Sequence, residues 1–307
     1  MIIAKKVTSH SRLGFIGLGY LGSRIARRLA AAGFTMVVHD RDREKTKEFE
    51  RAGAAVAQSP EKLGTDVEVV LSCLPNDAAV EAVFLGAGKL LESARPGTRI
   101  VELSTIAPET SRRLHDAARK SEVSMLDVAV SGSTATAEAG ALTLFGGGER
   151  EVFEGVQPVF APIASQWFYM GPSGSGVAMK LVVNTLLGLG MQSIAEAVAL
   201  GAGLGLPRDL LLDTLARTAV VAPAHVGKLA TAKRNDYAPQ FPVRLMHKDF
   251  GLILTAAAQR GLSMPATEAA AVVNSAEAGT GGEEDFSAVI RRMEQQVGLE
   301  HVLPPVA

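Results

Sequence analysis

The chain has 307 residues, of which 47% are hydrophobic, and its formal net charge at pH 7 is −1. This length and apolar content suffice for a large core and for two domains. Nucleic-acid binding requires a cluster of basic residues, and the sequence contains no run of like charges. We therefore expect no nucleic-acid partner. The single cysteine, Cys73, excludes an intramolecular disulfide and fits a reducing compartment.

Neither the N-terminus nor the most apolar stretch has the features of a targeting or membrane segment. Residues 1–11 contain two lysines but lack an apolar core of signal-peptide length, so we interpret them as a short extension. Residues 181–206 are interrupted by Asn184, Gln192 and Glu196, whereas a membrane span requires roughly 18 uninterrupted apolar residues. The sequence therefore predicts a cytoplasmic protein with no membrane partner.

A glycine-rich turn near the N-terminus carries the strongest functional signal. An apolar run that begins at Leu13 ends in Gly17-Leu-Gly-Tyr-Leu-Gly22, and apolar residues then recur at helical spacing. Glycines between a strand and a helix are typical of a dinucleotide fingerprint, where they permit a tight turn and close approach to a pyrophosphate. The helix N-terminus adds free N–H groups and a positive dipole end. The residues expected to contact the nucleotide are Gly17, Leu18, Gly19, Tyr20, Leu21 and Gly22.

The next predicted strand, residues 34–38, is followed by Asp40, about 20 residues beyond the glycines, as a ribose ligand requires. A carboxylate there accepts hydrogen bonds from a ribose 2′-OH and repels a 2′-phosphate, whereas Arg41 could pair with that phosphate. Asp40 and Asp42 flank the arginine, and an exposed ion pair contributes only about 0–1 kcal/mol. We therefore favour NAD as the cofactor and leave NADP use open.

Predicted strands and helices continue to alternate along the chain. The segments are strands at 67–71, 98–102, 124–128, 142–145 and 166–169 and helices at 43–53 and 108–120. This order predicts an α/β, Rossmann-like doubly wound parallel sheet.

The composition changes around residues 171–176, and residues 177–204 are long enough to form one extended helix. Only helical patterns follow. We therefore expect a Rossmann domain at residues 12–175 and an all-helical second domain at residues 176–307. The extended helix has more apolar faces than one domain covers, which favours a homodimer or homotetramer.

Two turns at the carboxyl edge of the predicted sheet are candidates for ligand contact, because open α/β sheets bind ligands at that edge. Pro75 follows a predicted strand and restricts the loop, although Pro-Asn-Asp is also an ordinary turn signal. The hydroxyls of Ser104 and Thr105 could face a nicotinamide or could cap the helix that begins at Pro108. The spacing leaves both interpretations of these hydroxyls open.

Two further groups could bind or convert a substrate. The turn Ser131-Gly132-Ser133 offers hydroxyls and backbone N–H groups that would form a nest for a carboxylate. Lys180 and Asn184 share one helix face, and apolar residues surround the lysine in the sequence. Because burial lowers the pKa of a lysine, such a residue can donate or accept a proton near neutral pH. No metal site is predicted.

These motifs, taken together and in order, resemble those of the β-hydroxyacid dehydrogenase family. The resemblance extends from Leu13 to about Arg292. The matching pieces are the glycine turn, Leu74-Pro75, Ser104-Thr105, Asp127-Val-Ala-Val-Ser131-Gly132, Gly174-Ser-Gly176 with Lys180 and Asn184, His247-Lys248-Asp249, and Gly282-Glu-Glu-Asp285-Phe-Ser287-Ala288.

The resemblance implies NAD(P)-dependent interconversion of a small 3-hydroxy acid, or a related hydroxy acid, and its semialdehyde or keto acid. It implies that Lys180 is the general acid/base, that Asn184 positions substrate and lysine, and that the Ser131-Gly132-Ser133 turn holds the substrate carboxylate. The cofactor-contact positions that it implies are Leu74, Pro75, Ala79, Thr105 and Lys248. From the residues alone, Lys248 and Asp249 indicate a salt-bridged helix face.

Some positions depart from the family pattern. Ser133 replaces a common second glycine, Thr185 a common asparagine, and Glu102 a usual aspartate, so the substrate of a known member cannot be transferred directly. Alternatives are an imine reductase, which generally lacks the lysine, and a decarboxylating 6-phosphogluconate dehydrogenase, which carries histidine at the position of Val183. A non-catalytic dinucleotide-binding protein would not need the lysine, the asparagine and the carboxylate nest together.

Overall fold

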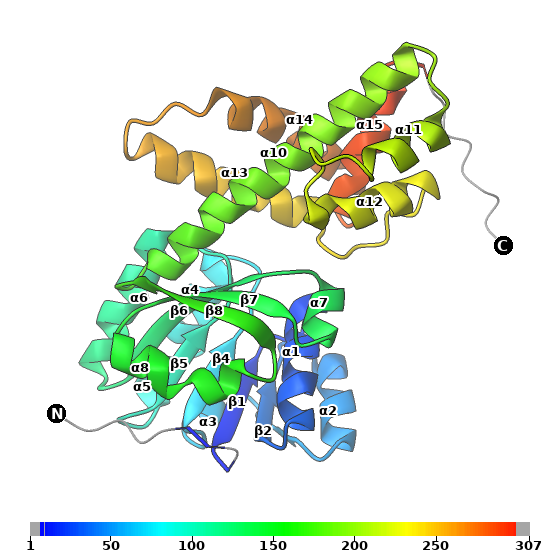
Figure 1. The fold of residues 1–307 in the computed structure, drawn as a ribbon. Helices are drawn as coiled ribbons and strands as arrows, with labels where there is room; N and C mark the ends of the chain where they lie inside the picture. Colours follow the sequence, from blue (N-terminus) through cyan, green and yellow to red (C-terminus); the bar gives the residue numbers. More distant parts are fainter. Residues whose placement is uncertain (1–6, 9, 299–307) are drawn as a thin grey trace. The chain divides into compact units, whose positions relative to one another are not determined.

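The computed structural model describes residues 7, 8 and 10–298 and divides into two compact units, residues 1–181 and 182–307 (Figure 1). Within the predicted N-terminal extension, residues 1–6 and 9 lie outside the described residues. The long helix α10 (Ser175–Gly203) begins at the predicted domain boundary, and the division between the two units falls within this helix.

The first unit contains an eight-stranded, mostly parallel sheet with the order β3-β2-β1-β4-β5-β6-β7-β8, which confirms the predicted Rossmann-like architecture. The exception is the antiparallel pair β6 and β7. Only residues 132–141 join these two strands, and a parallel crossover needs about a dozen residues or more. The strands are β1 (Arg12–Ile16), β2 (Thr35–His39), β3 (Ala55–Val56), β4 (Val69–Ser72), β5 (Arg99–Glu102), β6 (Ser124–Ser131), β7 (Leu142–Gly147) and β8 (Ala164–Gly171).

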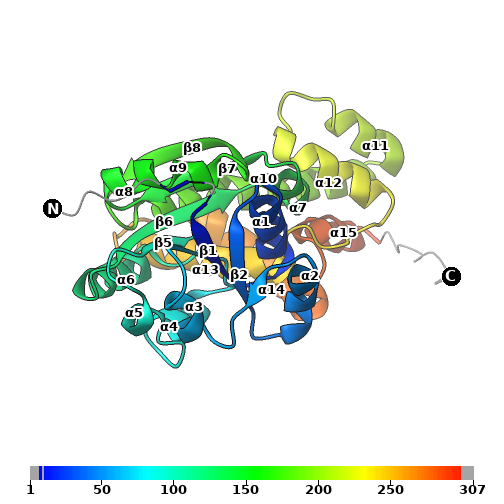
Figure 2. The same ribbon diagram turned by 90° about the horizontal axis from the view of Figure 1, so that it is seen from below.

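Helices cover both faces of this sheet (Figure 2). Because successive strand residues point to opposite faces, Phe15 packs with residues of α1, α2 and α7–α9, whereas Ile16 packs with residues of α3–α6. The helices are α1 (Tyr20–Ala31), α2 (Lys47–Arg51), α3 (Pro60–Gly64), α4 (Asp77–Phe84), α5 (Leu90–Ser93), α6 (Pro108–Lys120), α7 (Thr134–Glu138), α8 (Arg150–Gly155) and α9 (Gln157–Phe160).

Helix α6 begins and ends at the predicted residues, and Pro108 occupies the first helical position, where its missing N–H costs no helix hydrogen bond. The predicted helix over residues 43–53 is instead a 3-10 turn, η1 (Arg43–Thr46), followed by α2. The Asp42 side chain accepts a hydrogen bond from the Glu44 N–H and thereby starts the 3-10 turn. Phe49 of α2 is buried in the core of the first unit.

The second unit is helical, as predicted. It contains most of α10, and its core includes Met191, Met246, Phe250 and Phe286. The remaining elements are α11 (Arg208–Leu215), α12 (Pro223–Lys233), α13 (Val243–Ala258), α14 (Pro265–Gly281), η2 (Phe286–Ala288) and α15 (Val289–Gln295).

Helix α10 combines 29 residues with a mean hydropathy of 1.4 over its most apolar window, so by length and composition it could cross a membrane despite its polar residues. Asn184 and Gln192 are nevertheless buried among the helices of the second unit, and Met191, Ala195 and Val198 belong to the core there. In this apolar window 44% of the residues are buried, so part of α10 packs as a core helix of the second unit. The described residues give no clear indication of a membrane protein.

Candidate active site

The glycine turn has the geometry that its sequence predicts. Gly17 adopts φ +95°, and a side chain there would collide with the backbone oxygen of Cys73. A side chain at Gly22 would collide with the backbone oxygen of Gly17. A Cβ atom at Gly19, in contrast, would meet no atom within 4 Å, so this face of the turn is open. Gly19 precedes α1 and provides no side-chain cap, which leaves N–H groups of the first helical turn for an anion.

Asp40 lies directly against this turn. Its Oδ2 atom accepts a hydrogen bond of 2.7 Å from the Leu18 N–H, and its Oδ1 atom accepts one of 2.8 Å from the Asp42 N–H. The carboxylate is half-buried, whereas the neighbouring Arg41 is exposed. The glycine turn and Asp40, which together predict a nucleotide site, are therefore in direct contact in the structure.

The next two loops of the carboxyl edge are tied together by Ser104. Its buried hydroxyl accepts a hydrogen bond of 2.7 Å from the Leu74 N–H, so it does not cap α6, whose preceding residue Ala107 also provides no side-chain cap. Thr105 is half-buried beside it, and Pro75 is exposed. The Ala79 N–H is bonded to the Asn76 side chain at 2.9 Å, because Asn76 caps α4.

A buried carboxylate, Glu102, holds Ser104 in place. Its Oε1 atom accepts a hydrogen bond of 2.7 Å from the Ser104 N–H, and the Ser72 hydroxyl donates to its Oε2 atom. Burial raises the pKa of Glu102 to about 7, although the hydrogen bonds from Ser104 and Ser72 act in the opposite direction. The sequence identified Glu102 only as a departure from the family pattern and missed this positioning role.

The predicted substrate turn, Ser131-Gly132-Ser133, is stabilised by a capping box between Ser133 and Thr136 at the start of α7. Gly132 adopts φ +141°, and a Cβ atom there would lie 2.5 Å from Oγ1 of Thr136. The Ser133 N–H donates to Oγ1 of Thr136 at 2.7 Å, and the Ser133 hydroxyl accepts from the Thr136 N–H at 3.3 Å. The backbone donor of Ser133 is therefore already engaged, whereas the half-buried Ser131 closes the end of β6.

Lys180 and Asn184 occupy successive turns of α10, and both are buried. The Asn184 Nδ2 atom donates a hydrogen bond of 2.5 Å to Oδ2 of Asp249, and Lys248 Nζ lies 2.9 Å from Oδ1 of the same carboxylate. The salt bridge predicted for Lys248 and Asp249 is thus present. The sequence did not predict the hydrogen bond that Asn184 donates to Asp249, because the two residues are far apart in the chain.

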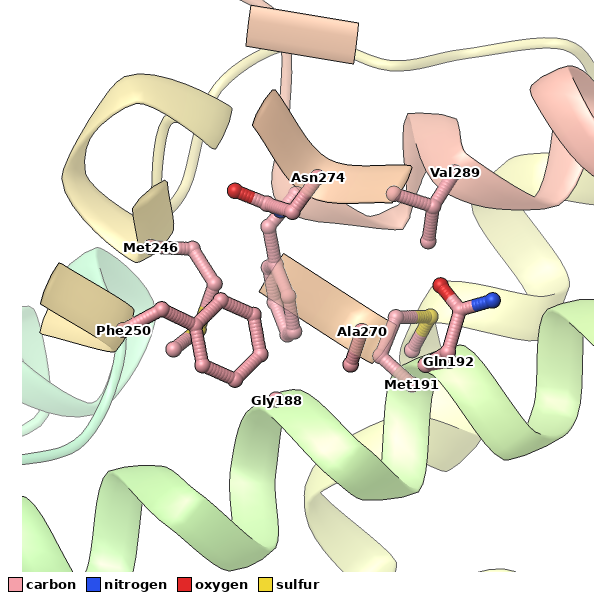
Figure 3. Close-up of a pocket in the computed structure, with 9 residues that line it drawn as sticks. Gly188, Met191, Gln192, Met246, Phe250, Ala270, Asn274 and Val289 are labelled. Carbon is pink, nitrogen blue, oxygen red and sulfur yellow. The ribbon is translucent and has the colours of Figure 1, made fainter. Parts of the chain in front are cut away.

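The helical unit contains a small cavity, which is lined in part by residues of α10 beyond Asn184. This cavity is too small to be a substrate pocket. Its volume is about 10 Å³, which accommodates about one water molecule. Met246 and Phe250 extend over Gly188 of α10, and Asn274 and Gln192 provide polar groups (Figure 3). Within the described ranges, no cluster of His, Cys, Asp or Glu side chains is arranged to hold a metal ion.

Two family models match the chain. Residues 12–171 match the NAD binding domain of 6-phosphogluconate dehydrogenase, and residues 174–293 match the NAD-binding model of NADP-dependent 3-hydroxyisobutyrate dehydrogenase. A 2-(hydroxymethyl)glutarate dehydrogenase of Eubacterium barkeri is 33% identical over 290 residues, which span 94% of this chain and 96% of the relative. The chain belongs to the β-hydroxyacid dehydrogenase family.

Two further similarities agree with this assignment. An NAD-dependent L-serine dehydrogenase of Pseudomonas aeruginosa is 38% identical over 262 residues, spanning 83% of this β-hydroxyacid dehydrogenase and 88% of the relative. A solved structure of a Mycobacterium tuberculosis 3-hydroxyisobutyrate dehydrogenase with L-serine has a TM-score of 0.84 at 29% identity, and the match covers 92% of this chain and 99% of that chain.

This β-hydroxyacid dehydrogenase is therefore an NAD(P)-dependent oxidoreductase that acts on small hydroxy acids. The residues of the first unit fit the cofactor. The open face at Gly19 and the uncapped start of α1 suit a pyrophosphate, and the Asp40 carboxylate beside Leu18 suits a ribose.

Proposed function

We propose that this enzyme interconverts a small 3-hydroxy acid and its semialdehyde or keto acid, with Lys180 as the general acid/base. The burial of Lys180 one helical turn before a buried, hydrogen-bonded Asn184 carries this proposal. The names of two relatives support the substrate class, because 2-(hydroxymethyl)glutarate and L-serine both have a hydroxymethyl group on the carbon that bears a carboxylate.

The glycine turn would hold an oxidised nicotinamide cofactor, which would supply the acceptor for the hydride on the carbon that bears the substrate hydroxyl. In this direction, the neutral Nζ atom of Lys180 accepts the hydroxyl proton, and in the reverse direction the ammonium donates it. Asp249 holds the Nδ2 atom of Asn184, which directs the Oδ1 atom of the amide away from the carboxylate. This buried Oδ1 atom has no hydrogen-bond partner in the described structure and is available to orient the substrate hydroxyl.

The substrate carboxylate is assigned to the Ser131-Gly132-Ser133 turn. Since Thr136 engages the Ser133 N–H, the hydroxyl of Ser131 and the N–H of Gly132 are the donors that we expect to contact the carboxylate. The Ser133 hydroxyl accepts from the Thr136 N–H but keeps its own proton for donation.

We assign the cofactor contacts to the glycine turn, the loops beyond β4 and β5, and one residue of the helical unit. NAD is the favoured cofactor, because the Asp40 carboxylate lies against the glycine turn and would repel a 2′-phosphate there. The proposed contact residues beyond the glycine turn are Asp40, Arg41, Leu74, Pro75, Ala79, Thr105 and Lys248.

We propose a cofactor domain at residues 12–175 and a helical domain at residues 176–307, supported by two family models that meet between residues 171 and 174. A homodimer or homotetramer is supported by exposed leucines of the helical unit, since Leu186, Leu200 and Leu204 are 64–73% exposed. Light scattering at micromolar concentration should give at least a dimer, and a monomer would contradict this. The proposed location is the cytoplasm.

The substrate proposal is tested by the absorbance of NADH or NADPH at 340 nm with a panel of 3-hydroxy acids, and in reverse with semialdehydes. Matched 2-hydroxy acids serve as controls because they differ only in the hydroxyl position. We expect turnover with at least one 3-hydroxy acid and slower turnover with its 2-hydroxy isomer. Turnover confined to 2-hydroxy acids would contradict the proposal.

A further inference from the structure

Asp127 is a fully buried carboxylate in the middle of β6, with 1% of its surface exposed. It pairs in register with Glu102 on one side and with Gly147 on the other. Its two oxygens accept hydrogen bonds from the start of the α10 segment, at 2.7 Å from the Gly174 N–H and 2.9 Å from the Val177 N–H. A carboxylate at this end of a helix is also favoured by the helix dipole.

The backbone around Asp127 leaves no space between strand and helix. A Cβ atom at Gly147 would lie 2.8 Å from both carboxylate oxygens, and one at Gly176 would collide with the backbone oxygens of Phe145 and Asp127. The nearby hydroxyl of Ser111 lowers the pKa of Asp127, although burial raises it more strongly. The first turn of α10 is therefore held on β6 and β7 by direct contacts.

Lys180 follows this turn immediately, three residues beyond Val177. A rotation or shift of the first turn would displace Lys180 by a similar amount, and a displacement of about 1 Å can lower a rate about 100-fold. We propose that Asp127 is a positioning residue that fixes the first turn of α10 on β6 and thereby places Lys180 for proton transfer. This inference rests on the proposed role of Lys180 as the general acid/base.

The variant Asp127→Asn keeps the size of the side chain but replaces one acceptor oxygen with an amide donor, which faces a backbone N–H in either orientation. We expect kcat to fall about 10- to 100-fold, with the KM for the cofactor changed less than about 2-fold. Asp116→Asn, on the exposed face of α6, makes the same charge change as a control and should leave kcat within about 2-fold.

A double-mutant cycle with Lys180→Ala separates positioning from general structural damage. If Asp127 acts through Lys180, Asp127→Asn lowers the residual kcat of the Lys180→Ala variant less than about 2-fold. The inference is overturned if Asp127→Asn lowers kcat by the same factor in the wild-type and Lys180→Ala backgrounds. It is also overturned if Asp127→Asn does not lower kcat in the wild-type background. A Lys180→Ala variant with wild-type kcat overturns the proposed function itself and removes the basis for positioning.

If Asp127→Asn does not fold, Gly176→Ala provides a second variant in the same cycle. Its added Cβ atom would push the first turn of α10 away from the backbone of β6 and β7. Gly203→Ala is the matched control, because its Cβ atom would lie 3.6 Å from Val297, an ordinary contact. Of these two substitutions, we expect only Gly176→Ala to lower kcat. We expect this fall when Lys180 is present and not in the Lys180→Ala background. A fall in kcat that persists without Lys180 overturns the inference.

Discussion

Asn184 and Asp249 are joined by a buried hydrogen bond of 2.5 Å between Nδ2 of the amide and Oδ2 of the carboxylate. This bond determines which end of the amide is free to contact other groups, because a carboxylate accepts only from the NH2 end. The same carboxylate pairs with Lys248 at 2.9 Å, so one buried group links two proposed site residues.

The first prediction is that Asp249→Ala lowers kcat/KM for the hydroxy acid about 10- to 100-fold, since a hydrogen bond to a charged group contributes about 1.5–3 kcal/mol. Without the carboxylate, the Asn184 amide is free to turn and loses its fixed orientation. Asp249→Asn retains an acceptor for Asn184, so its kcat/KM should fall less than that of Asp249→Ala. Steady-state kinetics of both variants tests this, and equal activity of Asp249→Ala and the wild type would contradict it.

The second prediction concerns pH and Glu102. Because burial raises the pKa of Glu102 from 4.5 to about 7, the folded state keeps a proton that the unfolded chain loses above pH 4.5. The free energy of unfolding should therefore fall as the pH rises from 4.5 to 7, by about 3 kcal/mol, and then level off. The folded state gains this contribution fully below pH 4.5.

Glu102→Gln removes this titration. Glutamine can still accept from the Ser104 N–H and can donate to the Ser72 hydroxyl. Denaturant unfolding at pH 5, 6, 7 and 8 should show the variant gaining stability relative to the wild type as the pH rises. Glu92→Gln, an exposed site on α5, should show a constant difference. A parallel pH dependence of Glu102→Gln and the wild type would refute this account.

The third prediction concerns the buried ion pair between Lys228 and Asp285, whose Nζ and Oδ2 atoms are 2.7 Å apart. Lys228→Met leaves a buried carboxylate with only backbone and Ser287 donors, so we expect the helical unit to lose about 3 kcal/mol of unfolding free energy. Lys233→Met breaks the exposed pair with Asp213 and should have a much smaller effect. Similar losses in the two variants by urea unfolding would count against the prediction.

The fourth prediction is a preference for NAD, measured as kcat/KM for NAD over that for NADP. The Asp40 carboxylate beside Leu18 should repel a 2′-phosphate, and Asp40→Asn should shift the ratio toward NADP about 10-fold, or about 1.4 kcal/mol. A wild-type preference for NADP that Arg41→Ala abolishes would show that the arginine outweighs the carboxylate.

Local patterns in the sequence predict α6, α10 and every strand of the sheet except the two-residue edge strand β3. The hydrophobic period, Pro108 and the Gly174-Ser-Gly176 turn that carry these predictions act over short distances. They also place Asp40 and the glycine turn correctly relative to each other, because strand and helix lengths determine that spacing. The antiparallel pairing of β7 and the hydrogen bonds from the Val177 N–H to Asp127 and from the Asn184 amide to Asp249 depend on contacts between distant segments, which no local pattern encodes.

The role of Lys180 is tested most directly by kcat of the Lys180→Ala variant, with cofactor affinity measured alongside by NADH fluorescence titration. We expect kcat to fall about 10²- to 10⁴-fold, the usual size of a general acid–base contribution, while the Kd for the cofactor stays within about 2-fold. Turnover by Lys180→Ala at a rate near that of the wild type would contradict the assignment of Lys180 as the proton donor and acceptor.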